Sequence, residues 1–297
     1  MEKQSSPKYY AVHPAWAGEM QAMDSGLDIQ KIKAQADADY LGPAAILATK
    51  GFNPDDVYQI SENEYYSYGD GLRYYVAENG RRIALINLQG LLYAGYGWND
   101  YKNAAEKIKA AEHPAYAGAL IMANSPGGHT AGMRKLNAAI ADFSKPIGVH
   151  VSGMLASAAA FIAAPADFIA ADPEEKNTFG SIGVFTVKQN YSKMNEKEGI
   201  EVAVIRSEGA DEKFKPNPYE PWTDEDLAKV QAAINKEAED FLNAMAVQRK
   251  ITAENLEKIK SGADYDTDEA FALGLHDGKA TFEQAINKLA NYQLLFI

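Results

Sequence analysis

The sequence predicts an α/β fold with a mainly parallel sheet, together with an N-terminal extension and C-terminal helices. Short apolar runs alternate with amphipathic stretches between residues 82 and 171, and short polar or glycine-containing turns separate them. Alternation of this kind, with short connections, is typical of right-handed βαβ units. The 297 residues are 46% hydrophobic and 24% charged, which suits one large globular domain with appended regions.

Three segments divide the chain. We expect an extension over residues 1–80, a core domain over residues 81–280 and a tail over residues 281–297. The extension holds two helical stretches and a run of tyrosines, at residues 29–36, 43–49 and 65–68. Where the core domain begins, Asn79-Gly80 separates two apolar runs. Because Asn-Gly favours the tightest hairpin turn, a β-hairpin is expected there.

Strands and helices are then expected in alternation along the core domain. The predicted strands are residues 83–88, 119–123, 147–151 and 168–171. The predicted helices between them are residues 99–111, 130–143 and 155–163. Thr223 opens a longer helix, in which apolar residues recur at helical spacing from Leu227 to Met245. Such a stripe indicates core packing or a contact between subunits.

Two short motifs lie where strands of this sheet end. Asn-Ser-Pro-Gly-Gly at residues 124–128 follows one strand, and Gly-Met-Leu-Ala-Ser-Ala-Ala-Ala at residues 153–160 follows the next. The glycines can turn sharply and expose backbone N–H groups, which is the chemistry of an oxyanion hole. Ser157 is expected near a helix N-terminus, where developing negative charge is favoured. Each motif alone is also typical of a turn or a helix cap, but their order favours a nucleophile beside an oxyanion hole.

A serine nucleophile needs a base, and two classes of side chain are available. The five histidines are His13, His113, His129, His150 and His276. His129 follows the glycine pair and His150 ends a strand, so a histidine triad is one alternative. The other is a lysine whose amine is neutral, and Lys213 and Lys215 flank an aromatic residue in a proline-containing segment.

These motifs resemble the signal peptide peptidase A type of Ser-Lys peptidase, which includes the phage head-maturation proteases. The likeness covers roughly residues 82–277 and includes a Gly-Ser-Ile-Gly-Val stretch at residues 180–184. The resemblance implies a ClpP/crotonase-like fold built from repeated ββα and βαβ units. It also implies a homo-oligomer, since relatives form rings in which neighbouring subunits build the active-site chamber.

The resemblance also implies a role for each site residue. Ser157 matches the nucleophile and Lys213 the general base. Gly127 and Gly128 match the turn that supplies oxyanion N–H groups. Ser181, within the Gly-Ser-Ile-Gly stretch, matches a position near the site and is a candidate supporting hydroxyl.

The lysine motif departs from the phage pattern. Phage members often carry Lys-x-x-Gly-Asn-Pro, whereas here Lys215-Pro216 precede Asn217 and proline stands in the glycine position. This departure leaves Lys215 as a rival to Lys213 for the role of base.

Composition excludes several other classes of function. The chain has no cysteine, so disulfides and thiolate metal sites are excluded. The net charge of −12 argues against a nucleic-acid partner. No metalloprotease helix, phosphate-binding loop or calcium loop is present, so no metal or cofactor is expected.

The expected location is the cytoplasm, or the host cytoplasm if a phage encodes the chain. No apolar run approaches the 18 or more residues that a membrane span needs, and the first residues lack the apolar core of a signal peptide. Membrane-bound members of the resembling family carry an anchor, so the likeness points to its phage-type branch or a cytosolic relative.

The expected function is a serine endopeptidase that hydrolyses polypeptide substrates such as capsid or scaffold proteins during phage capsid maturation. Two alternatives stay open. One is a non-catalytic capsid-assembly or scaffold protein that retains the peptidase fold. The other is a crotonase-type acyl-transforming enzyme, which would be expected to show an acidic pair near the glycine turn that the sequence does not provide.

Overall fold

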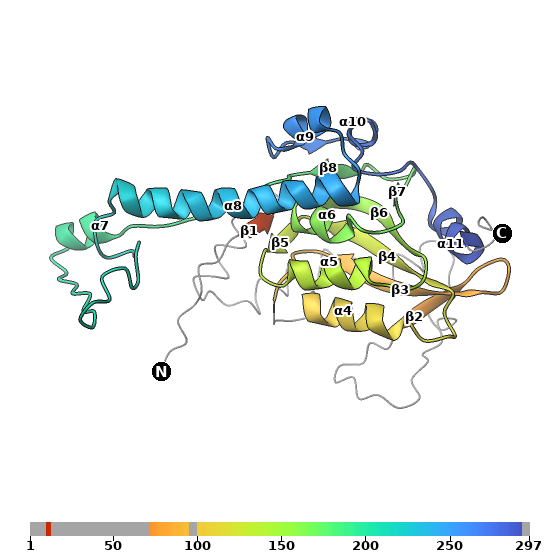
Figure 1. The fold of residues 1–297 in the computed structure, drawn as a ribbon, viewed down its shortest axis with the longest axis horizontal. Coiled ribbons are helices and arrows are strands. Elements are labelled where there is room, and N and C mark those ends of the chain that lie inside the picture. The colour runs from red at the N-terminus through yellow and green to blue at the C-terminus, as the bar shows by residue number, and fades with distance from the viewer. Residues whose placement is uncertain (1–9, 13–71, 95–99, 293–297) are drawn as a thin grey trace.

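The computed structural model describes residues 10–12, 72–94 and 100–292, and its centre is a mainly parallel sheet with helices on both faces (Figure 1). The strand order is β2-β3-β4-β6-β8-β9, and β7 also pairs with β6. The strands are β2 (Arg73–Val76), β3 (Arg82–Gln89), β4 (Gly118–Ser125), β6 (Ile147–Ala156), β7 (Phe168–Ala171), β8 (Thr178–Gly180) and β9 (Asp264–Tyr265). The inner pairs are parallel, and the outer pairs β2–β3 and β8–β9 are antiparallel. The predicted α/β fold class is therefore confirmed.

The hairpin expected at the start of the core is also confirmed. β2 pairs antiparallel with β3 on either side of Asn79-Gly80, and Gly80 adopts φ 79°, a backbone angle that glycine takes at little cost. The helices expected in the extension and the tyrosine run at residues 65–68 lie outside the described residues.

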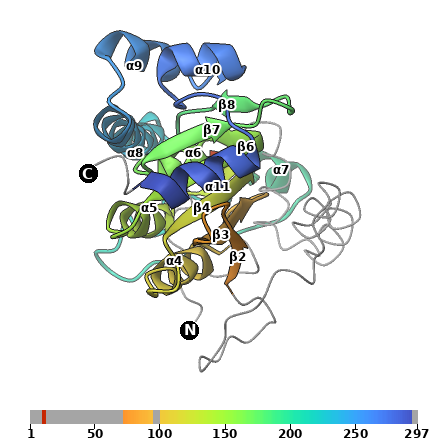
Figure 2. The ribbon, with the colours of Figure 1, turned by 90° about the vertical axis from the view of Figure 1, so that its right-hand side faces the viewer.

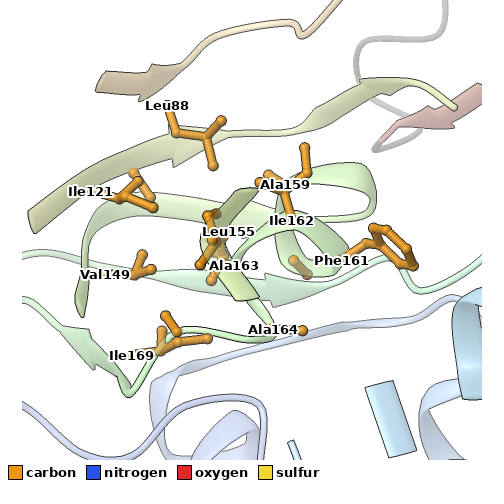
Figure 3. Close-up of a cluster of buried hydrophobic side chains, with 14 of the residues drawn as sticks. Leu88, Ile121, Val149, Leu155, Ala159, Phe161, Ile162, Ala163, Ala164 and Ile169 are labelled. Atoms are coloured by element: carbon orange, nitrogen blue, oxygen red, sulfur yellow. The ribbon is translucent and has the colours of Figure 1, made fainter. Parts of the chain in front are cut away.

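Three helices cover one face of the sheet, namely α4 (Tyr101–Ala110), α5 (Met133–Ala141) and α6 (Ala158–Ala163). All six residues of α6 are buried, and four of them are alanine, so the helix lies close to the strands. Figure 3 shows Ala159 and Ile162 of α6 among Ile121 and Val149 of the sheet. The small side chains that the sequence places after Ser157 therefore serve close helix–sheet packing.

The opposite face of the sheet is covered by α11 (Phe282–Asn291), which begins with a capping box at Thr281. Figure 2 shows this helix lying across the strands. The buried side chains between α11 and the sheet include Ile83, Leu85, Leu120, Phe168, Phe282, Ile286 and Leu289. The segment expected as a C-terminal tail thus contributes to the core.

The longest helix, α8 (Asp224–Gln248), divides into two halves. It begins at a capping box on Thr223, as the sequence predicts. Its C-terminal half packs on the core, where the rings of Phe241 and Phe161 lie 5.2 Å apart. Its N-terminal half extends away from the sheet, with α7 (Ser192–Lys197) at the far end (Figure 1). Residues 187–234, which include α7 and this half of α8, are called the arm below.

Two short helices complete the described chain after α8. They are α9 (Ala253–Ile259) and α10 (Thr267–Leu273), which enclose β9 at the edge of the sheet. None of the described helices is both long and apolar enough to cross a membrane.

Candidate active site

Ser157 lies at the turn between β6 and α6. The strand continues beyond the predicted end at residue 151, because Leu155 pairs with Ser125 of β4 and Ala156 pairs with Gly180 of β8. The helix expected from residue 155 begins instead at Ala158, so that start was wrong. A tight turn from a strand into a helix is the geometry that presents the nucleophilic serine in α/β-hydrolases.

The backbone of Ser157 is held in an unusual conformation. Its φ is 52° and its ψ is −125°. Non-glycine residues rarely adopt such backbone angles, and those that do are concentrated at functional sites. Its N–H donates to the carbonyl of Gly180 at 2.9 Å, and its carbonyl accepts from Phe161 N at 3.1 Å. Hydrogen bonds from both neighbouring elements therefore fix the turn.

The side chain of Ser157 is buried without a partner. Its Oγ has no hydrogen bond with any described residue. Leaving a buried hydroxyl unpaired costs about 1–3 kcal/mol, so a native structure that keeps one has a reason for it. A nucleophile that awaits a base and a substrate is such a reason.

The glycine turn follows directly from the neighbouring strand β4. Ser125 fixes the turn, because its Oγ donates to the carbonyl of Gly90 at 2.7 Å and accepts from Gly127 N at 3.1 Å. Gly127 itself adopts φ 97°. Since Ser125 pairs with Leu155, and α6 contacts β5 (Gly127–His129), the turn and Ser157 lie side by side.

The two predicted oxyanion donors differ in their surroundings. The Gly127 N–H already donates to Ser125, as described above. On one edge of β5, Leu92 N donates to the carbonyl of Gly127 at 2.9 Å, and His129 N donates to the carbonyl of Leu92 at 3.0 Å. Successive residues of a strand direct their backbone groups to opposite edges. The N–H of Gly128 therefore faces away from Leu92.

A neighbouring tyrosine supports the same strand. The hydroxyl of Tyr101 donates to the carbonyl of His129 at 2.6 Å, and burial raises the pKa of this tyrosine. The hydroxyl thus remains a neutral donor at any physiological pH, and the glycine turn is held from both sides.

Replacing Gly128 by alanine is expected to disable the turn. The added Cβ would lie 1.9 Å from the backbone carbonyl oxygen of Leu92. The backbone of Leu92 or of the turn itself would therefore have to shift. We expect peptidase activity to fall on the order of a hundredfold or more, as for loss of an oxyanion donor. Gly80→Ala is the matched control: its Cβ meets nothing within 4 Å, and the backbone strain at its φ of 79° falls on the β2–β3 hairpin rather than on the glycine turn, so activity should stay unchanged. Equal activity of the two variants in a peptide-cleavage assay would contradict this role for Gly128.

Two asparagines hold the strand just before Ser157. Asn124 Oδ1 accepts from Met154 N at 3.1 Å, and Asn177 Oδ1 accepts from Gly153 N at 2.9 Å. Asn177 is buried and also donates to the carbonyl of Asp172 at 2.8 Å. The role of Asn177 was missed from the sequence, where an isolated asparagine in a polar stretch looks like any other turn residue.

Ser181 directly follows β8, the strand that pairs with the residues just before Ser157. It follows Gly180, the residue whose carbonyl accepts the N–H of Ser157, and it is buried with φ 52°. Its own N–H donates to the carbonyl of Ala263 at 2.9 Å. The structure therefore brings together Ser157, the glycine turn and the end of β8, after which Ser181 follows.

The two lysines lie elsewhere, in the arm. Both Lys213 and Lys215 are exposed. The loop that carries them is organised by Arg206, whose guanidinium pairs with both carboxylate oxygens of Glu220. The hydrogen bonds from Arg206, and next from the buried Asn217, lower the pKa of Glu220 to about 2. The lysines therefore project from a well-defined loop.

Contacts along α8 show how far this loop lies from α6, the helix that begins directly after Ser157. Lys229 Nζ lies 2.7 Å from Glu212 Oε2, beside Lys213, whereas the same helix meets α6 at Phe241. With a rise of about 1.5 Å per residue, these twelve residues separate the two contact points by roughly 18 Å along the axis. Figure 1 shows the loop at the far end of the arm. Within one chain, the structure brings neither lysine to Ser157.

Residues 139–295 match the family model described as peptidase family S49. A protein of Methanocaldococcus jannaschii that is provisionally named as a protease is 31% identical over 226 residues, which cover 71% of this chain and 70% of that protein. The chain belongs to peptidase family S49. The predicted resemblance to the signal peptide peptidase A type is thereby confirmed.

Other relatives of this S49 chain are longer. Protease 4 of Salmonella typhi is 28% identical over 244 residues, covering 77% of the S49 chain and 38% of the relative. Capsid assembly protease C of Escherichia phage lambda is 25% identical over 279 residues, covering 89% of the S49 chain and 59% of the relative. The S49 chain thus spans less than two thirds of both.

Solved structures with a related arrangement include a variant of ClpP1 from Listeria monocytogenes. It is 14% identical with a TM-score of 0.43, covering 66% of the S49 chain and 91% of that chain. A variant of a membrane-bound stomatin-specific protease is 16% identical with a TM-score of 0.42, covering 66% and 78% respectively.

The histidines of the described part of the S49 chain serve other roles. His150 alternates with valines that face α6, so its ring lies on the opposite face of the sheet, 6.1 Å from that of Phe282. Its Nε2 lies 3.1 Å from the carbonyl of Ala280 and 3.8 Å from a carboxylate oxygen of Asp172. His276 stacks on Phe179 and contacts the carbonyl of Thr267. No described histidine forms a hydrogen bond with Ser157 Oγ, so the triad alternative gains no support.

Proposed function

We propose that this chain is a serine endopeptidase that uses Ser157 as its nucleophile. The observation that carries the proposal is the buried Oγ of Ser157, which has no hydrogen-bond partner among the described residues and sits at a strained strand-to-helix turn. The adjacent glycine turn directs the N–H of Gly128 away from its own supporting strand. A nucleophile and a donor for the oxyanion are thus neighbours, as acyl transfer requires.

The reaction then proceeds through an acyl-enzyme. A neutral lysine accepts the proton of Ser157 as Oγ attacks the scissile carbonyl carbon. The N–H of Gly128 stabilises the oxyanion, together with the N–H of Ala158, which opens α6 and has no partner within the helix. The lysine returns the proton to the leaving amine, and water hydrolyses the acyl-serine. Gly127 contributes by shaping the turn, with its N–H directed to Ser125.

We propose that a neighbouring copy of the chain supplies the lysine. The separation along α8 keeps both lysines away from the serine of their own chain, although they are exposed on the arm. If the lysine comes from a neighbouring copy, a single chain lacks the partner of the Ser157 hydroxyl. This accounts for the Oγ that has no hydrogen bond with any described residue. Lys213 remains the first choice by its place in the motif and Lys215 its rival. Ser181, beside the nucleophile, is the candidate that would orient the incoming amine.

The surface of the arm supports an assembly between copies. Nine of the twelve exposed large apolar residues of the described chain lie on it. They are Val187, Tyr191, Met194, Ile200, Val202, Ile205, Phe214, Tyr219 and Leu227. Monomeric proteins rarely expose such a concentration of apolar side chains, and a contact between subunits would bury it.

The natural substrate is proposed to be a polypeptide of a capsid or its scaffold, cut in the cytoplasm of an infected host. The similarity to capsid assembly protease C of phage lambda supports this setting. A non-catalytic scaffold role is the second candidate, and the exposed arm surface would serve it equally well.

The test is cleavage of an unfolded protein by the purified oligomer, with new termini identified by mass spectrometry. The proposal predicts cleavage that requires neither metal nor nucleotide. Turnover of acyl-coenzyme A thioesters without peptide cleavage would favour the crotonase-type alternative. Absence of both activities in an intact oligomer would favour the scaffold role.

A further inference from the structure

A segment close to the N-terminus lies against the glycine turn. β1 (Tyr10–Val12) pairs antiparallel with β5 and forms a separate two-stranded sheet with it (Figure 1). In this register Tyr10 opposes His129, Ala11 opposes Gly128 and Val12 opposes Gly127. No local pattern in the sequence indicates this pairing, which joins segments more than a hundred residues apart.

The pairing uses the edge of β5 that faces away from Leu92. Leu92 engages the carbonyl of Gly127 and the N–H of His129 on the other edge. The N–H and the carbonyl of Gly128 therefore face β1, and Ala11 lies directly opposite them. In an antiparallel pair, residues that face each other in this way exchange both backbone hydrogen bonds. The backbone of Ala11 thus meets the N–H that the proposed mechanism assigns to the oxyanion.

An extended peptide that adds a strand to an open edge is a common mode of peptide recognition. We infer that residues 10–12 are an internal pseudosubstrate strand, which occupies the position of a polypeptide substrate along β5 and must leave before a substrate binds. This inference rests on the proposed peptidase function and adds a form of regulation to the same site. The substrate class it implies is an extended backbone that pairs with Gly128.

β1 is short enough for a substrate to displace it from β5. It has three residues and pairs with one strand only, and an isolated two-stranded pair is marginally stable in water. A substrate peptide can make the same backbone hydrogen bonds and can therefore compete for this edge of β5. Pairing within the chain then raises the apparent KM, because the intrinsic KM is divided by the fraction of chains in which the edge is free.

The first test is a disulfide cross-link, since the chain has no cysteine of its own. Tyr10 and His129 form a pair without mutual backbone hydrogen bonds, for which the Cα atoms lie about 4.5 Å apart, within the range of a disulfide. We expect full-length Tyr10→Cys/His129→Cys to form a bond within one chain under mild oxidation. Ala11→Cys/His129→Cys is the matched control, because residue 11 opposes Gly128 and is one residue out of register with His129. Equal cross-linking of both variants, or bonds only between chains, would overturn the inference.

The second test is kinetic and also uses the full chain. Ala11→Pro removes the N–H that faces Gly128, whereas Val12→Pro removes an N–H that points away from β5. We expect Ala11→Pro to lower the KM for a peptide substrate several-fold with little change in kcat, and Val12→Pro to match the wild type. An unchanged KM in Ala11→Pro would overturn the inference. The cross-link requires no catalysis, so failure of the strand pairing and failure of the peptidase activity would be seen separately.

Discussion

Ser157→Ala is expected to abolish peptide-bond cleavage and to leave the fold intact. Removing a nucleophilic serine lowers kcat on the order of 10⁶-fold in a comparable enzyme, because the acyl-enzyme can no longer form. The Oγ makes no hydrogen bond with a described residue, so its removal breaks no interaction that stabilises the fold. The free energy of unfolding should therefore stay the same or rise slightly.

The measurement is the rate of peptide cleavage, together with a denaturation curve for each variant. Ser152→Ala is the matched control, since Ser152 lies on the same strand and is only half-buried. It should retain wild-type activity. Detectable turnover by the pure Ser157→Ala protein would contradict the assignment of the nucleophile.

Two inactive variants are expected to restore each other's activity when mixed. Ser157→Ala retains the lysine and Lys213→Ala retains the serine. If each site takes its serine from one copy and its lysine from a neighbour, random exchange at equal amounts makes about a quarter of the sites complete. Activity should therefore rise from near zero to about a quarter of the wild-type value.

The mixing experiment needs proof that subunits exchange, for which native mass spectrometry of differently tagged chains suffices. Mixing Ser157→Ala with Lys215→Ala tests the rival lysine: if Lys213 is the base, Lys215→Ala is active before mixing. A mixed oligomer that stays inactive would show that the base and the nucleophile belong to the same chain, against the geometry of the arm.

The sequence motifs predicted much of the candidate site, because the residues that the proposed chemistry needs are also those that the turn needs. The glycine pair at 127–128 is needed both for a sharp turn and for exposed N–H groups, so one short pattern indicated both. The alternation of strands and helices likewise predicted the sheet, because a buried parallel strand needs an apolar run wherever it occurs.

The errors arose where local preference does not decide the structure. Met154 and Leu155 suit a helix as well as a strand, and pairing with β4 and β8 keeps this segment extended through Ala156. The contact of β1 with β5 depends on distant backbone pairing, which leaves no periodic signal. The spacing of Ser157 and Lys213 along the chain likewise could not reveal whether they meet within one copy or between two.

The role of Ser157 as nucleophile is tested most directly by mass spectrometry after exposure of the assembled protein to a fluorophosphonate probe. We expect a single adduct on Ser157, absent in Ser157→Ala and strongly reduced in Lys213→Ala. An adduct on another residue, or equal labelling of Ser157→Ala and the wild type, would show that Ser157 is not the nucleophile.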